Sequence, residues 1–222
     1  MKIIGHRGAR GLAPENTLAG LQKGVEHGVD MVEFDIRVTK DGVPVLHHDE
    51  AVIDPNGEQR KIANHTYAEL HDHKKDLTTL DEVLSQISHS VRLYIEVKAG
   101  EPVHPIVKVL QHQLAHGWTA SDLMLSSFDA QILRDLHAAL PEVETMVLEK
   151  WSGTRATYRA RQLGTRNLCM NQLWLWKPFI QPMAKRGWNL YAYTLNDPTK
   201  ARRWAGYGLA GVVTDYPDRF QK

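Results

Sequence analysis

Residues 31–48 read MVEFDIRVTKDGVPVLHH, two strand-like apolar runs on either side of a turn. Asp41-Gly42 is a dipeptide typical of two-residue β-hairpin turns. The residues between the two runs are fewer than the dozen or so that a crossover between parallel strands needs. The run 43–48 is therefore predicted to return antiparallel to the run 31–36.

This hairpin also predicts which side chains share a face. A two-residue turn pairs His48 with Asp35, and a turn shifted by one position on both sides pairs His48 with Glu33. In both registers these three side chains lie on one face of the hairpin, whereas His47 points to the other. Two carboxylates and one imidazole are expected to gather there.

Elsewhere, strand-like runs alternate with amphipathic helical runs from end to end. Helices are predicted over residues 16–27, 79–87, 103–116, 130–140, 154–163, 178–186 and 198–207. Strands are predicted over residues 2–5, 31–36, 43–48, 93–97, 123–126, 144–148, 167–170, 189–195 and 211–214. Such alternation indicates parallel strands joined by helices on the outside.

With one of nine candidate strands antiparallel, eight parallel strands remain, as in a (β/α)8 TIM barrel of the α/β class. Residues 1–222 are predicted to form one domain, with the β-hairpin and a short insertion after the second strand. Residues 50–77 form the longest irregular stretch and are expected to lie near the barrel mouth.

Composition excludes several classes of protein. The formal net charge of +1 and pI of about 7.9 provide no overall field for nucleic acid or an anionic membrane, so local groups must hold any anionic ligand. A single cysteine, Cys169, excludes an internal disulfide and fits a reducing compartment. Without a signal-like N-terminus or a bilayer-length apolar run, we expect a cytoplasmic protein that begins near Met1 and does not insert stably into membranes. The oligomeric state stays open.

Charged side chains lie at the ends of several predicted strands. His6, Glu33, Asp35 and Glu96 occupy such ends, and His48 returns to the same end through the hairpin. In a barrel, functional groups gather at the carboxyl ends of the strands. A buried carboxylate is costly unless something compensates it, and three of them without cysteine suit Mg²⁺ or Ca²⁺ better than zinc.

Two cationic side chains adjoin these residues. Arg7 follows the first histidine, and Lys98 follows the last carboxylate. A divalent cation with a guanidinium and an ammonium group is a combination that stabilises a phosphoryl group in its transition state. Two imidazoles nearby can take and give a proton. The pattern predicts an enzyme that cleaves a phosphate ester.

Two further pairs have alternative interpretations. Trp174 and Trp176 alternate on a strand-like run near the rim, where they either pack in the core or form an apolar wall for substrate; core packing is favoured. Asn16 and Thr17 are most simply helix-capping residues, although Glu15 and Asn16 are also placed to brace the site.

Residues 5–17, which read GHRGARGLAPENT, resemble the glycerophosphodiester phosphodiesterase family, as does the motif Glu33-Phe34-Asp35. The resemblance continues, in order, through residues 39–42, 45–49, 96–98, 127–128 and 214–217. It implies a TIM barrel that uses Ca²⁺ or Mg²⁺ to hydrolyse glycerophosphodiesters to sn-glycerol 3-phosphate and an alcohol.

The resemblance also implies a role for each site residue. These roles are metal ligands for Glu33, Asp35 and Glu96, general acid and base for His6 and His48, and phosphate contacts for Arg7 and Lys98. Which histidine is the base stays open, as does the choice between water and a substrate hydroxyl as the nucleophile. This chain departs from many relatives at Tyr193, where they have tryptophan. The shape of the pocket wall therefore stays open.

Two other functions fit parts of the pattern. A phospholipase of the sphingomyelinase D type shares the histidine pair and the metal cluster, but it should be exported and have an apolar rim that faces the membrane. A non-catalytic barrel that binds phosphate esters would be expected to lack one of the two histidines, and this chain has both.

Overall fold

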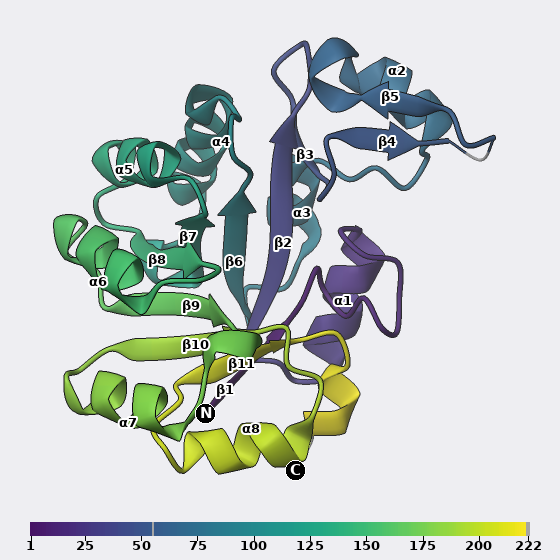
Figure 1. Cartoon of the computed structure of the whole chain (residues 1–222). Coiled ribbons are helices and arrows are strands. Elements are labelled where there is room, and N and C mark those ends of the chain that lie inside the picture. The colour runs from purple at the N-terminus through teal and green to yellow at the C-terminus, as the bar shows by residue number, and fades with distance from the viewer. Residues whose placement is uncertain (55, 221–222) are drawn as a thin grey trace.

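The computed structural model describes residues 1–54 and 56–220. Over these residues eight parallel strands close into a barrel, because β1 pairs with both β11 and β2 (Figure 1). The eight strands are β1 (Lys2–Gly5), β2 (Met31–Val38), β6 (Arg92–Val97), β7 (Leu123–Ser127), β8 (Glu144–Glu149), β9 (Asn167–Asn171), β10 (Asn189–Tyr193) and β11 (Gly211–Thr214). The predicted (β/α)8 barrel is confirmed.

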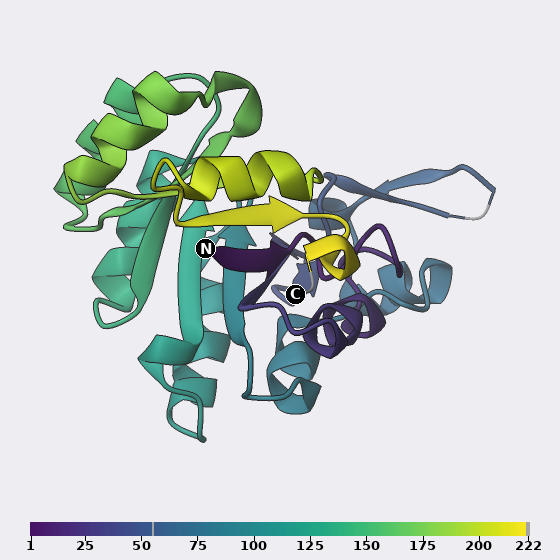
Figure 2. The ribbon, with the colours of Figure 1, turned by 90° about the horizontal axis from the view of Figure 1, so that it is seen from below.

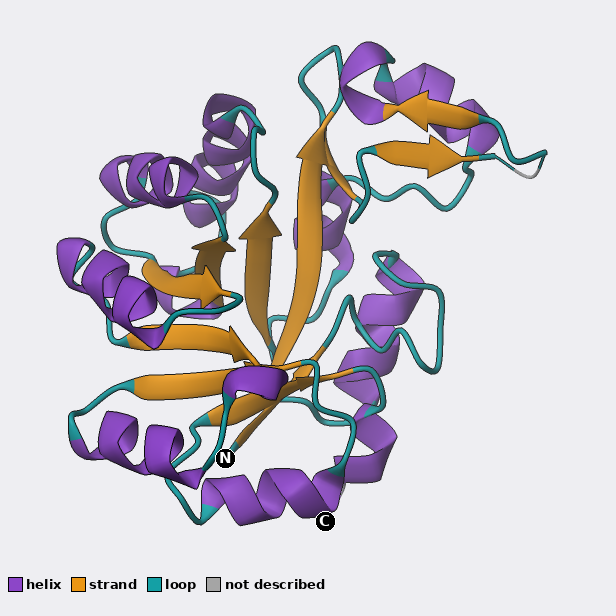
Figure 3. Ribbon diagram, in the orientation of Figure 1, coloured by secondary structure: helices purple, strands orange, loops and turns teal. Residues whose placement is uncertain are grey.

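Helices surround the strands, as Figure 3 shows. They are α1 (Leu18–Glu26), α3 (Leu80–Gln86), α4 (Val103–Leu114), α5 (Ala130–Ala139), α6 (Gly153–Gln162), α7 (Lys177–Lys185) and α8 (Pro198–Ala205), with short 3₁₀ turns η2 (Ala120–Asp122), η3 (Gln172–Trp174) and η4 (Pro217–Phe220). Polar caps fix where several helices begin; the Thr17 hydroxyl, for example, accepts a hydrogen bond from the Gly20 N–H. Each of the seven predicted helices is found within a few residues of its expected ends.

The core has two layers. One lies between the strands and the helices and includes Phe34, Leu93 and Leu190. The other fills the barrel interior and includes Tyr94 and Cys169. Because strand side chains alternate, each strand supplies both layers, and the interior layer forms an apolar floor beneath the barrel mouth.

The hairpin after β2 differs from the predicted register. Strand β3 (Pro44–Leu46) is antiparallel to β2, and Leu46 pairs with Ile36. In either predicted register the partner of Leu46 would be one position away from Ile36. The Thr39 N–H donates to the Val43 carbonyl, and Gly42 has a φ of +81°, so the loop has three residues with the glycine in the left-handed region. An odd loop moves every opposed pair by one, and both predicted registers are wrong.

The described residues of the insertion that follows contain regular secondary structure, where an irregular stretch was predicted. It contains β4 (Ala51–Ile53), β5 (Gln59–Lys61), the 3₁₀ turn η1 (Ile62–Asn64) and α2 (Tyr67–His73). Figure 2 shows it projecting from the barrel on one side. A small apolar cluster that includes Val52, Ile62 and Leu70 holds these elements to β3.

The prediction that Trp174 and Trp176 pack in the core is wrong. Their exposed fractions are 42% and 51%, whereas Leu175 between them is 5% exposed. Leu175 has an extended backbone, so its neighbours point to the opposite side. The alternation is real, but the leucine faces the core.

Candidate active site

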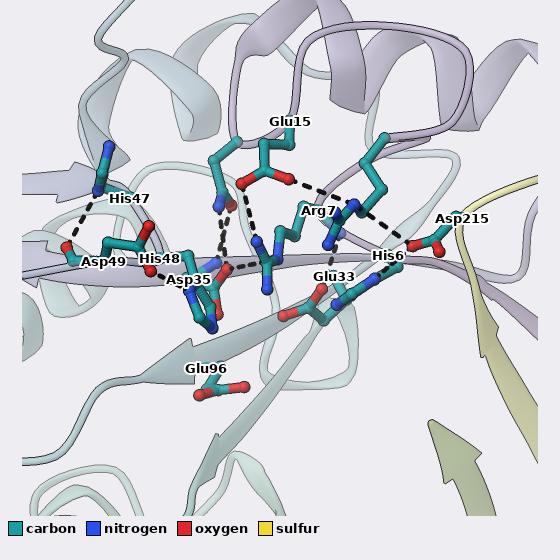
Figure 4. A network of polar contacts seen from close by, with 12 residues as sticks. His6, Arg7, Glu15, Glu33, Asp35, His47, His48, Asp49, Glu96 and Asp215 are labelled. Carbon is teal, nitrogen blue, oxygen red and sulfur yellow. Dashed lines mark hydrogen bonds and ion pairs between the residues drawn. The ribbon is translucent and has the colours of Figure 1, made fainter. Parts of the chain in front are cut away.

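A cavity of about 680 Å³ opens at the carboxyl ends of the strands. The site residues predicted from the sequence all line it: His6, Arg7, Glu33, Asp35, His48, Glu96 and Lys98. Figure 4 shows most of them around one centre. Sequence positions up to 92 residues apart therefore meet at one mouth.

Three carboxylates form the centre of the site. Glu33 and Asp35 lie two residues apart on β2 and so share a face, and Asp35 pairs in register with Glu96 on β6. An oxygen from each of the three lies within 4.8 Å of one from each of the others. All three residues are at most 9% exposed, so this negative charge is concentrated away from water.

Their protonation reflects this crowding. Burial, and then repulsion from Asp35 and Glu96, raises the pKa of Glu33 well above its ordinary value. Burial and the charge of Asp35 also raise the pKa of Glu96. Burial acts to raise the pKa of Asp35, but the attraction of Lys98 and Arg7 outweighs it and the pKa is lowered. Only part of the negative charge is compensated by the protein.

Lys98 and Arg7 supply that compensation. The Lys98 ammonium lies 2.7 Å from Asp35 Oδ1 and 2.5 Å from Glu96 Oε1. Arg7 Nε lies 3.3 Å from Asp35 Oδ2, and Arg7 Nη1 lies 2.8 Å from Glu15 Oε1. Desolvation acts to lower the pKa of both cations, but the carboxylates raise it above the ordinary value. Both side chains stay charged at neutral pH.

The loop after β1 is shaped to brace the carboxylates. Arg7 has a φ of +48°, and its N–H donates to Glu33 Oε2 at 2.8 Å. Asn16 has a φ of +54°; its side-chain amide donates to Asp35 Oδ2 and its Oδ1 accepts the Asp35 N–H. Of the two residues predicted to cap α1, Thr17 does so and Asn16 does not. The bracing interpretation of Glu15 and Asn16 fits this geometry.

Each of the two histidines that line the cavity has a carboxylate on Nδ1. His6 Nδ1 lies 2.6 Å from Asp215 Oδ1, and His48 Nδ1 lies 2.7 Å from Asp49 Oδ1. A carboxylate on Nδ1 orients the ring and leaves Nε2 for a ligand. Burial lowers the pKa of His48, although the charge of Asp35 acts to raise it. The lowered pKa favours the neutral form of the ring at neutral pH.

His48 lines the cavity for a reason that the sequence argument did not contain. In the observed register the N–H of His47 donates to the Asp35 carbonyl. Strand β3 ends at Leu46, so strict alternation does not extend to His48. His47 points away from the three carboxylates (Figure 4), and its Nδ1 lies 3.0 Å from the Asp49 carbonyl. The predicted orientations hold although the pairing behind them was wrong.

Asp215 and Asn196 were not predicted as site residues. Asn196 Nδ2 donates to Asp215 Oδ2 at 2.8 Å, and Asn196 Oδ1 accepts the Asp215 N–H at 2.9 Å. The hydrogen bonds from His6 and Asn196 outweigh burial and lower the pKa of Asp215. The available signal was the carboxylate directly after the last strand, within a segment that the family resemblance already included.

The opposite wall of the cavity is largely apolar. Phe128, Leu148 and Tyr193 line it, and Lys150 reaches it from the loop after β8. The Phe128 and Tyr193 rings meet edge to face with centroids 5.8 Å apart. The cavity thus offers a charged side for an anion and an apolar side for the rest of a ligand.

No helix among the described residues combines the length and the hydropathy needed to cross a bilayer.

Comparison with known proteins adds to this geometry. The sequence model of the "Glycerophosphoryl diester phosphodiesterase family" matches residues 6–219. A glycerophosphodiester phosphodiesterase of Bacillus altitudinis is 25% identical over 100% of this chain and 97% of its own length. Among solved structures, an Oleispira antarctica phosphodiesterase in complex with the product sn-glycerol-3-phosphate has a TM-score of 0.86 at 25% identity, covering 99% of this chain and 95% of that one. A Thermotoga maritima glycerophosphodiester phosphodiesterase has a TM-score of 0.81 at 26% identity, with 99% and 96% covered.

Proposed function

This chain belongs to the glycerophosphoryl diester phosphodiesterase family, and we propose that it hydrolyses glycerophosphodiesters to sn-glycerol 3-phosphate and an alcohol. The observation that carries the proposal is the convergence of three carboxylates, two imidazoles and two fixed cations on one cavity. A barrel that binds phosphate esters without cleaving them has no need of a carboxylate-held imidazole pair.

The three carboxylates are suited to a divalent cation, and we propose Ca²⁺ or Mg²⁺. Glu33, Asp35 and Glu96 provide only hard oxygen donors, close together and buried. Burial, and then repulsion between the carboxylates, raises the pKa of Glu33 and Glu96, and a bound cation would relieve both effects. A cation bound there supplies charge neutralisation at a phosphate oxygen and at the developing transition state.

Arg7 and Lys98 are proposed to hold the phosphodiester. Both are charged, largely buried and fixed by the carboxylates that they contact. A phosphodiester is a monoanion, so attack on phosphorus is favoured when cationic groups neutralise its oxygens. The planar guanidinium of Arg7 also suits two phosphate oxygens at once.

His6 and His48 are proposed as the proton-transfer pair. One imidazole takes the proton of the nucleophile, and the other protonates the departing alkoxide, which is otherwise a poor leaving group. Asp215 holds the first ring and Asp49 the second. The two rings come from different segments, since His6 follows β1 and His48 follows β3.

One observation favours a second candidate, a phospholipase of the sphingomyelinase D type. Exposed tryptophans lie in the loops after β8 and β9, which is the apolar rim that such an enzyme would need. A location in the cytoplasm, which is a prediction from the sequence, argues against this candidate.

One assay tests both candidates. The purified protein is incubated with glycerophosphocholine, glycerophosphoethanolamine or sphingomyelin, and the products are identified with and without EDTA. We expect sn-glycerol 3-phosphate from the first two substrates, loss of turnover with EDTA and recovery with Ca²⁺ or Mg²⁺; the His48→Ala variant is the inactive control. Cleavage of sphingomyelin alone would replace the proposed substrate class, and turnover that resists EDTA would contradict the cation.

A further inference from the structure

Four large apolar side chains are exposed together in the loops that follow β8 and β9. Trp151, Leu173, Trp174 and Trp176 have exposed fractions of 63%, 79%, 42% and 51%. The rings of Trp151 and Trp174 meet edge to face, with centroids 5.8 Å apart, and so join the two loops. Contiguous exposed apolar side chains of this size mark an interaction surface in soluble proteins. We call these four side chains the tryptophan rim.

The tryptophan rim borders the cavity. Strands β8 and β9 are neighbours in the barrel (Figure 1), and their carboxyl ends open on the same mouth as the carboxylates. Lys150, which lines the cavity, directly precedes Trp151. Whatever covers the rim therefore lies at the entrance to the active site.

The first of the two loops is held rigidly with its tryptophan outward. The Glu149 carboxylate, with only 1% of its side chain exposed, accepts the N–H groups of Lys150 and Trp151 at 2.9 and 3.0 Å. Arg155 donates to the same carboxylate through two contacts of 2.6 Å. The exposure of Trp151 is thus a property of a braced turn.

The second loop is braced in the same way. Asn171 Oδ1 accepts the Leu173 N–H at 2.9 Å, and the Gln172 amide donates to the Thr194 carbonyl. Leu175 is buried, which directs Trp174 and Trp176 away from the core. Both loops therefore present a preformed apolar surface.

The surrounding sequence is basic. Residues 150–196 contain no Asp or Glu but eight Lys and Arg, of which Arg155 and Arg159 contact Glu149 just outside this segment. Lys150 and Lys177 are exposed beside the rim and form no ion pair with any described residue. Tryptophan beside lysine is the combination found where proteins meet the interface of a bilayer, and lysines near that surface favour anionic lipid.

We propose that the tryptophan rim docks on an anionic phospholipid bilayer, with the mouth of the barrel facing the lipid. Docking requires no spanning helix, because the side chains enter only the interfacial layer. If the proposed function also holds, docking brings the site to glycerophosphodiesters that carry an acyl chain and reside in the bilayer. That second statement rests on the proposed function, and the docking itself does not.

The test is flotation with phospholipid vesicles. Wild-type protein is mixed with vesicles of phosphatidylcholine alone or with about 30% phosphatidylglycerol, and the floated fraction is measured at low and high salt. We expect binding to the anionic vesicles that weakens with salt and falls at least about tenfold in the triple variant Trp151→Ser, Leu173→Ser, Trp176→Ser. Tyr158→Ser, which removes an exposed aromatic side chain from α6 outside the rim, is the matched control and should float like the wild type.

The remaining outcomes separate this proposal from the previous one. Turnover of soluble glycerophosphocholine by the triple variant should stay within about twofold of wild type, because the rim does not contact the reacting groups. Absence of wild-type flotation, or equal flotation of the triple variant, would overturn the docking proposal. A wild-type dimer that the triple variant converts to a monomer would assign the rim to a second copy of the chain instead. Flotation without turnover of any glycerophosphodiester would support docking and contradict the proposed function.

Discussion

The two sides of the barrel mouth differ in which kind of side chain is buried and which is exposed. On the side formed by β1, β2 and β6, buried cations contact carboxylates: Lys98 bridges Asp35 and Glu96, and Arg7 joins Asp35 to Glu15. On the side formed by the loops after β8 and β9, apolar groups are exposed and two lysines stand without an ion pair among the described residues. The first side is arranged to act on a small charged group. The second is arranged to meet something larger and apolar.

This difference has an energetic consequence. Buried carboxylates whose charges are incompletely offset destabilise the fold in the absence of a ligand, because desolvation of a charge exceeds what imperfect pairing returns. Exposed tryptophans have little effect on the fold, since their surface is exposed to water in the unfolded chain as well. Substitutions on the charged side should therefore change both turnover and stability, and those on the apolar side should change neither for a soluble substrate.

The largest effect is expected from loss of the cation. EDTA, or the substitution Glu33→Gln, should reduce turnover of glycerophosphocholine by roughly 10³-fold, because several kcal/mol of charge stabilisation disappears. Steady-state kinetics with added Ca²⁺ or Mg²⁺ measure it, and recovery is expected for wild type after EDTA but not for the variant. Unchanged turnover of the variant would remove Glu33 from the ligand set.

The next effect tests whether both imidazoles belong to the charged side. His6→Ala and His48→Ala should each reduce turnover by roughly 10²-fold or more, the low end for general acid–base groups. His47→Ala is the matched control in the same segment, and it should remain within about twofold of wild type because its ring points away from the carboxylates. A large loss in His47→Ala together with a small one in His48→Ala would reverse the roles of the two neighbours.

A smaller effect separates the two carboxylates that hold the histidines. Asp215 has 19% of its side chain exposed and is fixed by Asn196, whereas Asp49 has 73% exposed. Asp215→Asn should lower kcat about 10-fold or more and change the pH profile, because the His6 ring loses its orienting charge. Asp49→Asn should lower it less, since a solvated carboxylate is more weakly coupled to its partner. Equal losses of kcat in the two variants would show that burial of the carboxylate does not decide how strongly it acts on its histidine.

The smallest effect is on the stability of the metal-free protein. The pKa of Glu33 is raised in the folded state, so its contribution to stability is complete below its unfolded pKa, about 4.3, and is lost as pH rises through the raised value. Without a cation, Glu33→Gln should remove this decline and raise the Tm near pH 7 by about 4 °C. Thermal unfolding in EDTA across this pH range measures it. A variant less stable than wild type at pH 7 would mean that Glu33 is compensated without a cation.

Much of the fold followed from local patterns in the sequence. The period of apolar residues located strands and helices, because one face of each must be buried. The register of the hairpin did not follow, since Asp41-Gly42 fits a two-residue turn and a three-residue turn equally well. The hydrogen bond from the Thr39 N–H to the Val43 carbonyl is what distinguishes them in the structure. The short strands and the helix of the insertion were also missed, because its small cluster draws single apolar residues from a polar stretch.

Site residues were predictable where they are charged side chains within predicted strands, and less so where they lie in loops. Glu33, Asp35 and Glu96 were conspicuous because carboxylates are rare in buried strands. Asp215 was not, because its partner His6 lies 209 residues away and a pairing over that distance has no local signature. The exposure of Trp174 was misjudged because alternation indicates two faces without indicating which is inner.

The closure of the barrel by β11 against β1 has a consequence during protein synthesis. Strand β11 is the last to leave the ribosome, and the carboxylate that holds His6 follows it directly. A nascent chain that ends before Gly211 has an open sheet edge at β1 and an unheld imidazole, even though its three other carboxylates have already been translated. A complete site therefore requires the last of the eight barrel strands and the aspartate that follows it, whatever has folded before them.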